Sequence, residues 1–151
     1  MDELQNRGWE KIRGVREHMP VLALLEERYA RDKPLSGKRV AMAIHLEAKT
    51  ARLALALKAL GAEVAVTSSN PLSAKDDVAL ALSDEMPVHA RGEATEEEYR
   101  EFLLKVLSIR PHLVLDDGGD LSYLLHTEAL SALEPEKLKV EELAAAIEET
   151  S

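Results

Sequence analysis

The stretch Pro111-His-Leu-Val-Leu-Asp-Asp-Gly-Gly-Asp-Leu121 decides how this chain folds. The apolar run Leu113–Leu115 is long enough for a buried β-strand, and it ends abruptly at carboxylates and glycines. In open parallel α/β sheets, ligands bind at the carboxyl ends of the strands. The sequence therefore makes Asp116, Asp117 and Asp120 candidates for chemistry. For Asp120 a structural role as the cap of the next helix is favoured, because an apolar run follows it.

Further short segments are typical of strands, and segments with helical periodicity separate them. The expected strands are Arg39–Ile44, Glu63–Thr67 and Pro87–Ala90, and the expected helices are Glu3–Arg16, Met19–Tyr29, Thr50–Leu60, Ser73–Leu82, one that begins at Thr95, and a C-terminal helix with Val140, Leu143, Ala144 and Ile147 on its apolar face. Ser73 is expected to cap its helix, and Thr95 with Glu98 matches a capping box.

The alternation of strands and helices predicts the fold class. It is typical of an α/β fold with a doubly wound parallel sheet of at least four strands and helices on both faces. We expect a three-layer arrangement of the flavodoxin-like or Rossmann-like kind, with extra N-terminal helices. Residues 1–151 are expected to form a single domain, which is long enough to bury a core.

The composition argues against several classes of protein. The chain has 28 acidic and 19 basic residues and a formal charge of −9, so a nucleic-acid partner is not expected. No apolar run approaches the roughly 18 residues that a membrane span needs, and no signal peptide pattern opens the chain. We therefore expect a cytoplasmic protein with no membrane partner. The absence of cysteine removes thiolate nucleophiles and cysteine-based zinc sites.

His45 differs from the other histidines of the chain. It lies where a strand passes into a helix, and Glu47, Lys49 and Thr50 follow it. These side chains form either a functional cluster or a solvated helix start, and the residues alone leave both interpretations open. Two other histidines lie beside or within apolar strands, where structural roles are favoured: His89 and His112. No two of the five histidines have the spacing of a zinc site on a helix, so we expect no metal.

The glycines do not match the common nucleotide-binding motifs. The seven glycines form neither a Gly-x-Gly-x-x-Gly fingerprint nor a triphosphate-binding loop. A Gly-x-Ser-x-Gly elbow is also missing, which argues against a serine hydrolase.

Eight motifs follow one another in the order and approximate spacing of a known family. They are Met19-Pro-Val-Leu, Lys33-Pro-Leu-Ser-Gly, His45-Leu-Glu-Ala-Lys-Thr50, Leu60-Gly-Ala-Glu-Val, Ser68-Ser-Asn-Pro-Leu-Ser73, Asp116-Asp-Gly-Gly-Asp-Leu121, His126 and Glu148-Glu-Thr150. From about residue 8 to its end, the chain resembles S-adenosylhomocysteine hydrolase (adenosylhomocysteinase). The likeness covers only the N-terminal, substrate-binding part of that enzyme, and the second domain of the family, which holds NAD, is not represented.

The resemblance implies a reaction and a set of residues. In the family, tightly held NAD oxidises the ribose so that homocysteine can leave from the 5′ carbon, after which water adds. Carried over to this chain, His45 and Asp117 are the catalytic residues. The implied substrate-binding residues are Glu47, Lys49, Thr50, Asn70, Glu149 and Thr150. The expected ligand is a nucleoside or an S-nucleosylhomocysteine. We expect no NAD bound by this chain alone, and ribose oxidation by it alone is implausible.

Two departures from the family pattern bear on specificity. Many members have Thr-x-Glu where this chain has Glu47-Ala-Lys49, and that glutamate accepts a hydrogen bond from the adenine amino group. Because an ammonium only donates, Lys49 facing the purine predicts a preference for inosine over adenosine. The alternative is that Lys49 points to solvent. The segment Ser73-Ala-Lys-Asp76 also loses polar groups, which predicts looser substrate contacts.

Three interpretations of the whole chain remain at this stage. The leading one is the substrate-binding part of an adenosylhomocysteinase-like hydrolase within a longer polypeptide. The second is a complete non-catalytic module that binds nucleosides or forms oligomers, and a homo-oligomer is possible in either case. The third is a receiver-like domain that binds magnesium through Asp116 and Asp117. It is disfavoured, because receivers carry the acid pair after the first strand, which here ends at His45.

Overall fold

The computed structural model describes residues 2–127. Its elements are α1 (Glu3–Gly14), a 3-10 turn η1 (Arg16–His18), α2 (Pro20–Tyr29), β1 (Arg39–Ala43), α3 (Ala48–Ala59), β2 (Glu63–Thr67), α4 (Asp76–Leu82), α5 (Glu96–Leu107), β3 (Leu113–Asp116) and α6 (Asp120–Leu125). The predicted helix with Val140, Leu143, Ala144 and Ile147 lies outside the described residues, as do Glu149 and Thr150.

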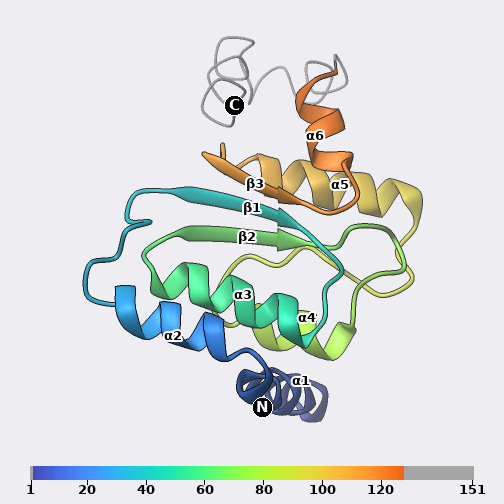
Figure 1. Cartoon of the computed structure of the whole chain (residues 1–151). Helices are drawn as coiled ribbons and strands as arrows, with labels where there is room; N and C mark the ends of the chain where they lie inside the picture. Colours follow the sequence, from blue (N-terminus) through green and yellow to red (C-terminus); the bar gives the residue numbers. More distant parts are fainter. Residues whose placement is uncertain (1, 128–151) are drawn as a thin grey trace.

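The strands form one parallel sheet in the order β2-β1-β3, with β1 in the centre (Figure 1). The prediction of at least four strands was wrong for residues 2–127, in which the sheet has three. The predicted strand Pro87–Ala90 lies parallel to β2, but it pairs only through an isolated bridge between Val66 and Val88. Because proline has no backbone N–H, Pro87 contributes only its carbonyl, which accepts from the Val66 amide at 3.0 Å.

Helices cover both faces of the sheet, which confirms the doubly wound α/β architecture (Figure 1). One core, which includes Val40, Met42 and Val66, lies under α1, α3 and α4. The other, which includes Ala41 and Ala43, lies under α5 and α6. Neighbouring β1 residues thus enter opposite cores, as the alternation of side chains along a strand requires.

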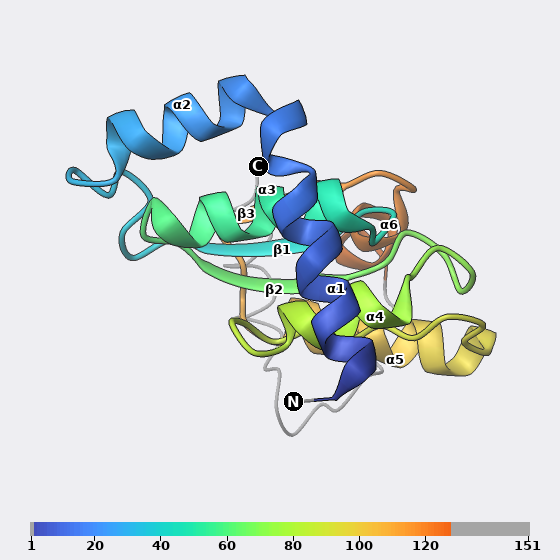
Figure 2. The ribbon, with the colours of Figure 1, turned by 90° about the horizontal axis from the view of Figure 1, so that it is seen from below.

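The N-terminal helices pack on the outside of this framework. Helix α1 crosses α4 and also contacts α3 (Figure 2), and the indole Nε1 of Trp9 donates to Asp84 Oδ2 at 3.1 Å. Helix α2 has Pro20 at its first position, which suits a residue without an N–H, and it buries none of its side chains completely. Helix α5 begins with the predicted capping box, because the amides of Thr95 and Glu98 each bond the other residue's side chain.

Candidate functional site at the carboxyl edge of the sheet

The carboxyl ends of all three strands meet at one edge of the sheet. Ala43 at the end of β1 pairs with Thr67 of β2 on one side and with Asp116 of β3 on the other. The first residue after β3 is tied to β1 as well, because the Asp117 amide donates to the Ala43 carbonyl at 3.0 Å. His45 and Asp117 therefore follow neighbouring strands at the same edge.

The segment between β1 and α3 holds His45 by its backbone. The hydroxyl of Thr50 donates to the carbonyl of His45 at 2.6 Å, and Thr50 is buried while the His45 side chain is exposed. The Leu46 amide donates to the Ser73 carbonyl at 2.8 Å, which links this segment to the loop after β2. The hydroxyl of Thr50, a predicted substrate-binding residue, thus donates to the backbone of the chain itself. The side chain of His45, in contrast, is exposed to solvent.

Helix chemistry accounts for only one of the two charged side chains at the start of α3, because the helix dipole favours the carboxylate of Glu47 there and disfavours the ammonium of Lys49. Glu47 is the N-cap residue, yet its carboxylate makes no capping hydrogen bond. Lys49 lies in the first helical turn, where the helix dipole disfavours a positive charge. Both side chains are exposed, and neither has an ion-pair partner within residues 2–127. Residues that break a local rule without a visible compensation are expected at functional sites.

The polar loop after β2 is organised by Ser73. Its Oγ accepts from the amides of Ser69 at 3.1 Å and Asn70 at 3.0 Å, so it is not the predicted cap of α4. That helix starts after Lys75 with no side-chain cap. Because Asn70 Oδ1 accepts from the Leu72 amide at 2.9 Å, the exposed Asn70 offers its amide nitrogen, a donor, to a ligand.

The two acids at the end of β3 have different environments. Asp116 is half-buried, and its oxygens accept from the amides of Gly119 at 3.0 Å and Ser122 at 2.8 Å. Asp117 is exposed, and its carboxylate has no hydrogen-bond partner in the described part of the chain. Only Asp117 is therefore open to a ligand.

The predicted role of Asp120 as a helix cap was wrong. Gly119 occupies the N-cap position of α6 with φ 85°, a left-handed conformation that suits glycine. Asp120 Oδ2 instead accepts from the hydroxyl of Tyr99 at 2.6 Å. Burial, together with the Asp120 carboxylate, raises the pKa of Tyr99, so this phenol stays protonated and remains a donor. Sequence analysis missed Tyr99, because its place in the apolar stripe of α5 is typical of a core residue.

The turn after β3 and the loop after β2 lie directly against each other. A Cβ added at Gly118 would lie 3.0 Å from the Ser69 carbonyl oxygen, a tighter contact than most Cβ atoms make, so glycine suits this close approach. Next to this contact, the hydroxyl of Thr67 is buried with no hydrogen-bond partner. The edge thus gathers an imidazole, a carboxylate and an amide donor from three segments that are distant in the sequence.

The described residues do not fit a dinucleotide or a metal. A dinucleotide pyrophosphate needs a Gly-x-Gly-x-x-Gly turn between a strand and a helix. The turn between β1 and α3, Ile44–Glu47, contains no glycine, and the turn between β3 and α6 has only the adjacent Gly118 and Gly119, which do not form this pattern. Within residues 2–127, no group of three histidine or acidic side chains is arranged to hold a metal ion. Over the same range, no helix has the length and apolarity needed to cross a membrane.

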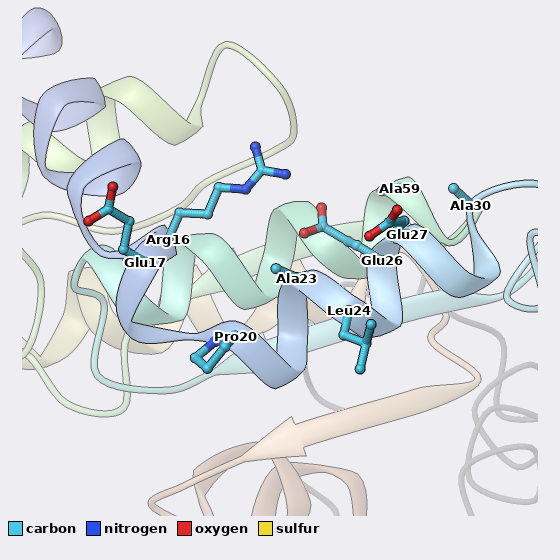
Figure 3. Close-up of a pocket in the computed structure, with 9 residues that line it drawn as sticks. All are labelled: Arg16, Glu17, Pro20, Ala23, Leu24, Glu26, Glu27, Ala30 and Ala59. Atoms are coloured by element: carbon cyan, nitrogen blue, oxygen red, sulfur yellow. The ribbon is translucent and has the colours of Figure 1, made fainter.

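A hollow of about 720 Å³ lies beside α2, away from the strand ends (Figure 3). Its lining residues are Arg16, Glu17, Pro20, Ala23, Leu24, Glu26, Glu27, Ala30 and Ala59. None of the strand-end side chains lines it, so we locate the candidate site at the sheet edge, where the chemically competent groups converge.

Comparison with known proteins identifies the family of this chain. The sequence profile of the S-adenosyl-L-homocysteine hydrolase family matches residues 3–150. The adenosylhomocysteinase of Thermotoga maritima is 54% identical over 130 residues, which are 85% of this chain and 32% of that protein. The S-inosyl-L-homocysteine hydrolase of Methanocaldococcus jannaschii is 51% identical over 133 residues, 87% of this chain and 32% of that protein. The aligned part thus spans about a third of either relative. The chain belongs to the S-adenosyl-L-homocysteine hydrolase family.

Proposed function

We propose that this chain binds the nucleoside part of an S-nucleosylhomocysteine, as the substrate-binding part of a hydrolase that releases homocysteine and a nucleoside. The observation that carries the proposal is the meeting of His45 and Asp117 at one sheet edge, where the Asp117 amide donates to the Ala43 carbonyl at 3.0 Å. An exposed imidazole and an exposed carboxylate on neighbouring strand ends can exchange protons with, and orient, a bound ribose.

The proposed roles follow from the hydrogen-bond donors and acceptors of each side chain that are not used within the described residues. The Asp117 carboxylate accepts hydrogen bonds from ribose hydroxyls, and the His45 imidazole serves as proton donor or acceptor near the reacting carbons. Asn70 donates from its side-chain amide, because its oxygen is already used within the loop. Glu149 and Thr150 remain proposed ribose-binding residues outside the described range.

We propose that binding by this chain alone does not lead to turnover. NAD, which would supply the oxidation of the ribose, is proposed to be held by a part of the protein beyond this chain, since the described residues do not fit it. The alternative of a complete binding module predicts a native polypeptide near 16.7 kDa by intact-mass measurement. The hydrolase proposal predicts a several-fold larger mass, as in the relatives.

We further propose that Lys49 selects the purine. Its ammonium can donate to the carbonyl oxygen at position 6 of hypoxanthine, whereas the amino group of adenine at that position cannot accept. The lysine's unfavourable place in the first turn of α3, with no ion-pair partner within residues 2–127, supports a ligand-directed role. Inosine is therefore the preferred nucleoside.

Calorimetric titration of the purified chain with inosine and adenosine tests both proposals. We expect inosine to bind roughly tenfold more tightly, the size of one hydrogen bond to a charged donor. Lys49→Glu is expected to reverse the order. Lys38→Glu makes the same charge change at the opposite end of β1 and is expected to leave the order unchanged. Equal affinities in the wild type would refute the role of Lys49, and no binding of either nucleoside would refute the binding function.

A further inference from the structure

We infer that Asp116 and Tyr99 are positioning residues that aim Asp117 at the ligand, an inference that rests on the proposed function. Neither one contacts the ligand. Asp116 uses both carboxylate oxygens inside the chain, and the Tyr99 hydroxyl is bonded to Asp120 at 2.6 Å. Asp116 begins the short turn between β3 and α6, and Tyr99 bonds Asp120 at the end of that turn. Asp117 is the exposed acid within the turn.

Asp116 fixes the turn from its first residue. The last residue of β3 reaches forward to the amides of Gly119 at 3.0 Å and Ser122 at 2.8 Å, and so ties the strand end to the first turn of α6. Because hydrogen bonds to a charged acceptor are about twice as strong as neutral ones, these two contacts hold the turn more firmly than backbone bonds alone. These contacts fix the backbone from which the exposed side chain of Asp117 extends.

Tyr99 fixes the turn from its other end. Its ring is buried in the core between α5 and the sheet, so its hydroxyl is a rigid donor, and Asp120 at the start of α6 is its acceptor. The turn is held between these two anchors by the Asp117 amide on Ala43 and by the contact of Gly118 with Ser69. Because the backbone is held on both sides of Asp117, only its side chain has to be ordered when a ligand binds, which is the purpose of supporting residues around a site.

The first test measures the ligand-free chain by NMR. In Asp116→Asn, one side-chain oxygen is replaced by an NH₂ group that cannot accept, so the amide of Gly119 or Ser122 loses its partner. We expect at least tenfold faster hydrogen exchange at that amide, and shifted resonances of the Asp117 carboxyl carbon and the His45 ring. Tyr99→Phe is expected to shift the same resonances. If Asp116→Asn does not fold, Tyr99→Phe provides the test.

Asp84→Asn is the matched control. Like Asp116, Asp84 accepts two hydrogen bonds, here from the side chains of Gln5 at 2.6 Å and Trp9 at 3.1 Å, but it lies where α1 meets the end of α4. We expect it to lower stability without moving the Asp117 and His45 resonances. Unchanged resonances in both Asp116→Asn and Tyr99→Phe would overturn the inference, whatever the chain binds.

The second test is a double-mutant cycle on inosine affinity. Asp116→Asn is expected to weaken binding about tenfold in the wild type and to have no further effect in Asp117→Asn, because it acts through Asp117. The same weakening in both backgrounds would contradict a positioning role. If the wild type binds no nucleoside, the proposed function fails, and the ligand-free NMR measurement alone decides the positioning role.

Discussion

Gly8 of α1 lies against the backbone carbonyl of Asp77 in α4, so closely that a Cβ at Gly8 would overlap that oxygen. The two helices therefore pack by direct backbone approach. A glycine within a helix lowers stability by about 1 kcal/mol relative to alanine. At Gly8 the missing side chain allows α1 to pack directly against α4.

Gly8→Ala is expected to destabilise the chain despite the better helix propensity of alanine. The added methyl group forces α1 away from α4, which costs about 1–3 kcal/mol, as for other insertions into packed interiors. Urea unfolding measures the loss. Gly14→Ala is the control, because nothing lies within 4 Å of its Cβ position, and a gain of up to about 1 kcal/mol is expected. A stabilised Gly8→Ala variant would contradict the close approach.

The ion pair of Lys11 with Asp77, at 2.5 Å, is expected to make the docking of α1 dependent on pH. Burial opposes ionisation of Asp77, but Lys11, the Val78 amide and Arg7 together hold its pKa below the ordinary value. A lowered folded-state pKa gives stability that is present above the unfolded-state pKa, about 3.9, and is lost as the pH falls through the folded-state value.

Lys11→Met is therefore expected to cost most at neutral pH. We expect a loss of about 1 kcal/mol at pH 7, a modest figure because Lys11 is half exposed. The loss should become smaller as the pH falls below the ordinary carboxyl range and through the lowered folded-state pKa of Asp77, where this carboxyl becomes protonated. Denaturant unfolding between pH 7 and pH 2.5 measures this difference. Lys58→Met, which removes an exposed pair with Glu85, is expected to cost little at any pH. A Lys11→Met deficit that is independent of pH would rule out the linkage.

A largely buried ion pair links α2 to α3. Arg52 Nη2 of α3 lies 2.6 Å from Glu26 Oε2, and the side chains are only 12% and 18% exposed. Glu26→Gln leaves the arginine charge without its partner, so we expect hydrogen exchange in α2 to become about tenfold faster, with a cost of about 1–3 kcal/mol. Glu27→Gln, at an exposed neighbouring position, is expected to change neither. Equal exchange in the two variants would show that the pair does not hold α2.

Asp117→Asn is expected to separate binding from stability. The side chain is exposed and has no partner within residues 2–127, so the free energy of unfolding should change by less than about 0.5 kcal/mol. Inosine affinity is expected to fall about tenfold, because the amide replaces a charged acceptor. Glu63→Gln makes the same kind of change at the opposite end of the sheet and is expected to affect neither quantity. A large loss of stability in Asp117→Asn would instead indicate a structural acid.

Much of this architecture could be predicted from the sequence, because it depends on local patterns. The strand Glu63–Thr67 was predicted to the residue, and the capping box at Thr95 is present. A structural role for His112 is confirmed, since its Nδ1 accepts from the Arg39 amide at 3.0 Å. The strand and the capping box depend on residues close in sequence, and the structural role of His112 was predicted from its place beside an apolar run, although its partner Arg39 is distant in the sequence.

The errors arose where a polar side chain had several possible partners. Ser73 and Asp120 both occupy positions typical of caps, but Ser73 bonds the loop before it, and Asp120 bonds a tyrosine from another helix. The partner that such a side chain bonds depends on which residues the fold places beside it. A local sequence pattern does not contain that information. The resemblance singled out Asp117 of the adjacent acids Asp116 and Asp117, but the hydrogen bonds of Asp116 to the amides of Gly119 and Ser122 could not be predicted from the sequence.

The central place of β1 has a consequence for how ligand binding and folding are coupled. Its end is the only strand end with neighbours on both sides in the described sheet, so the loops after β2 and β3 reach the site only when both pairings are complete. A ligand held by all three segments would be released by any opening that separates either outer strand. Saturating nucleoside is therefore expected to slow exchange of the β1 amides by the full factor 1 + [L]/Kd, so that the sheet itself reports occupancy.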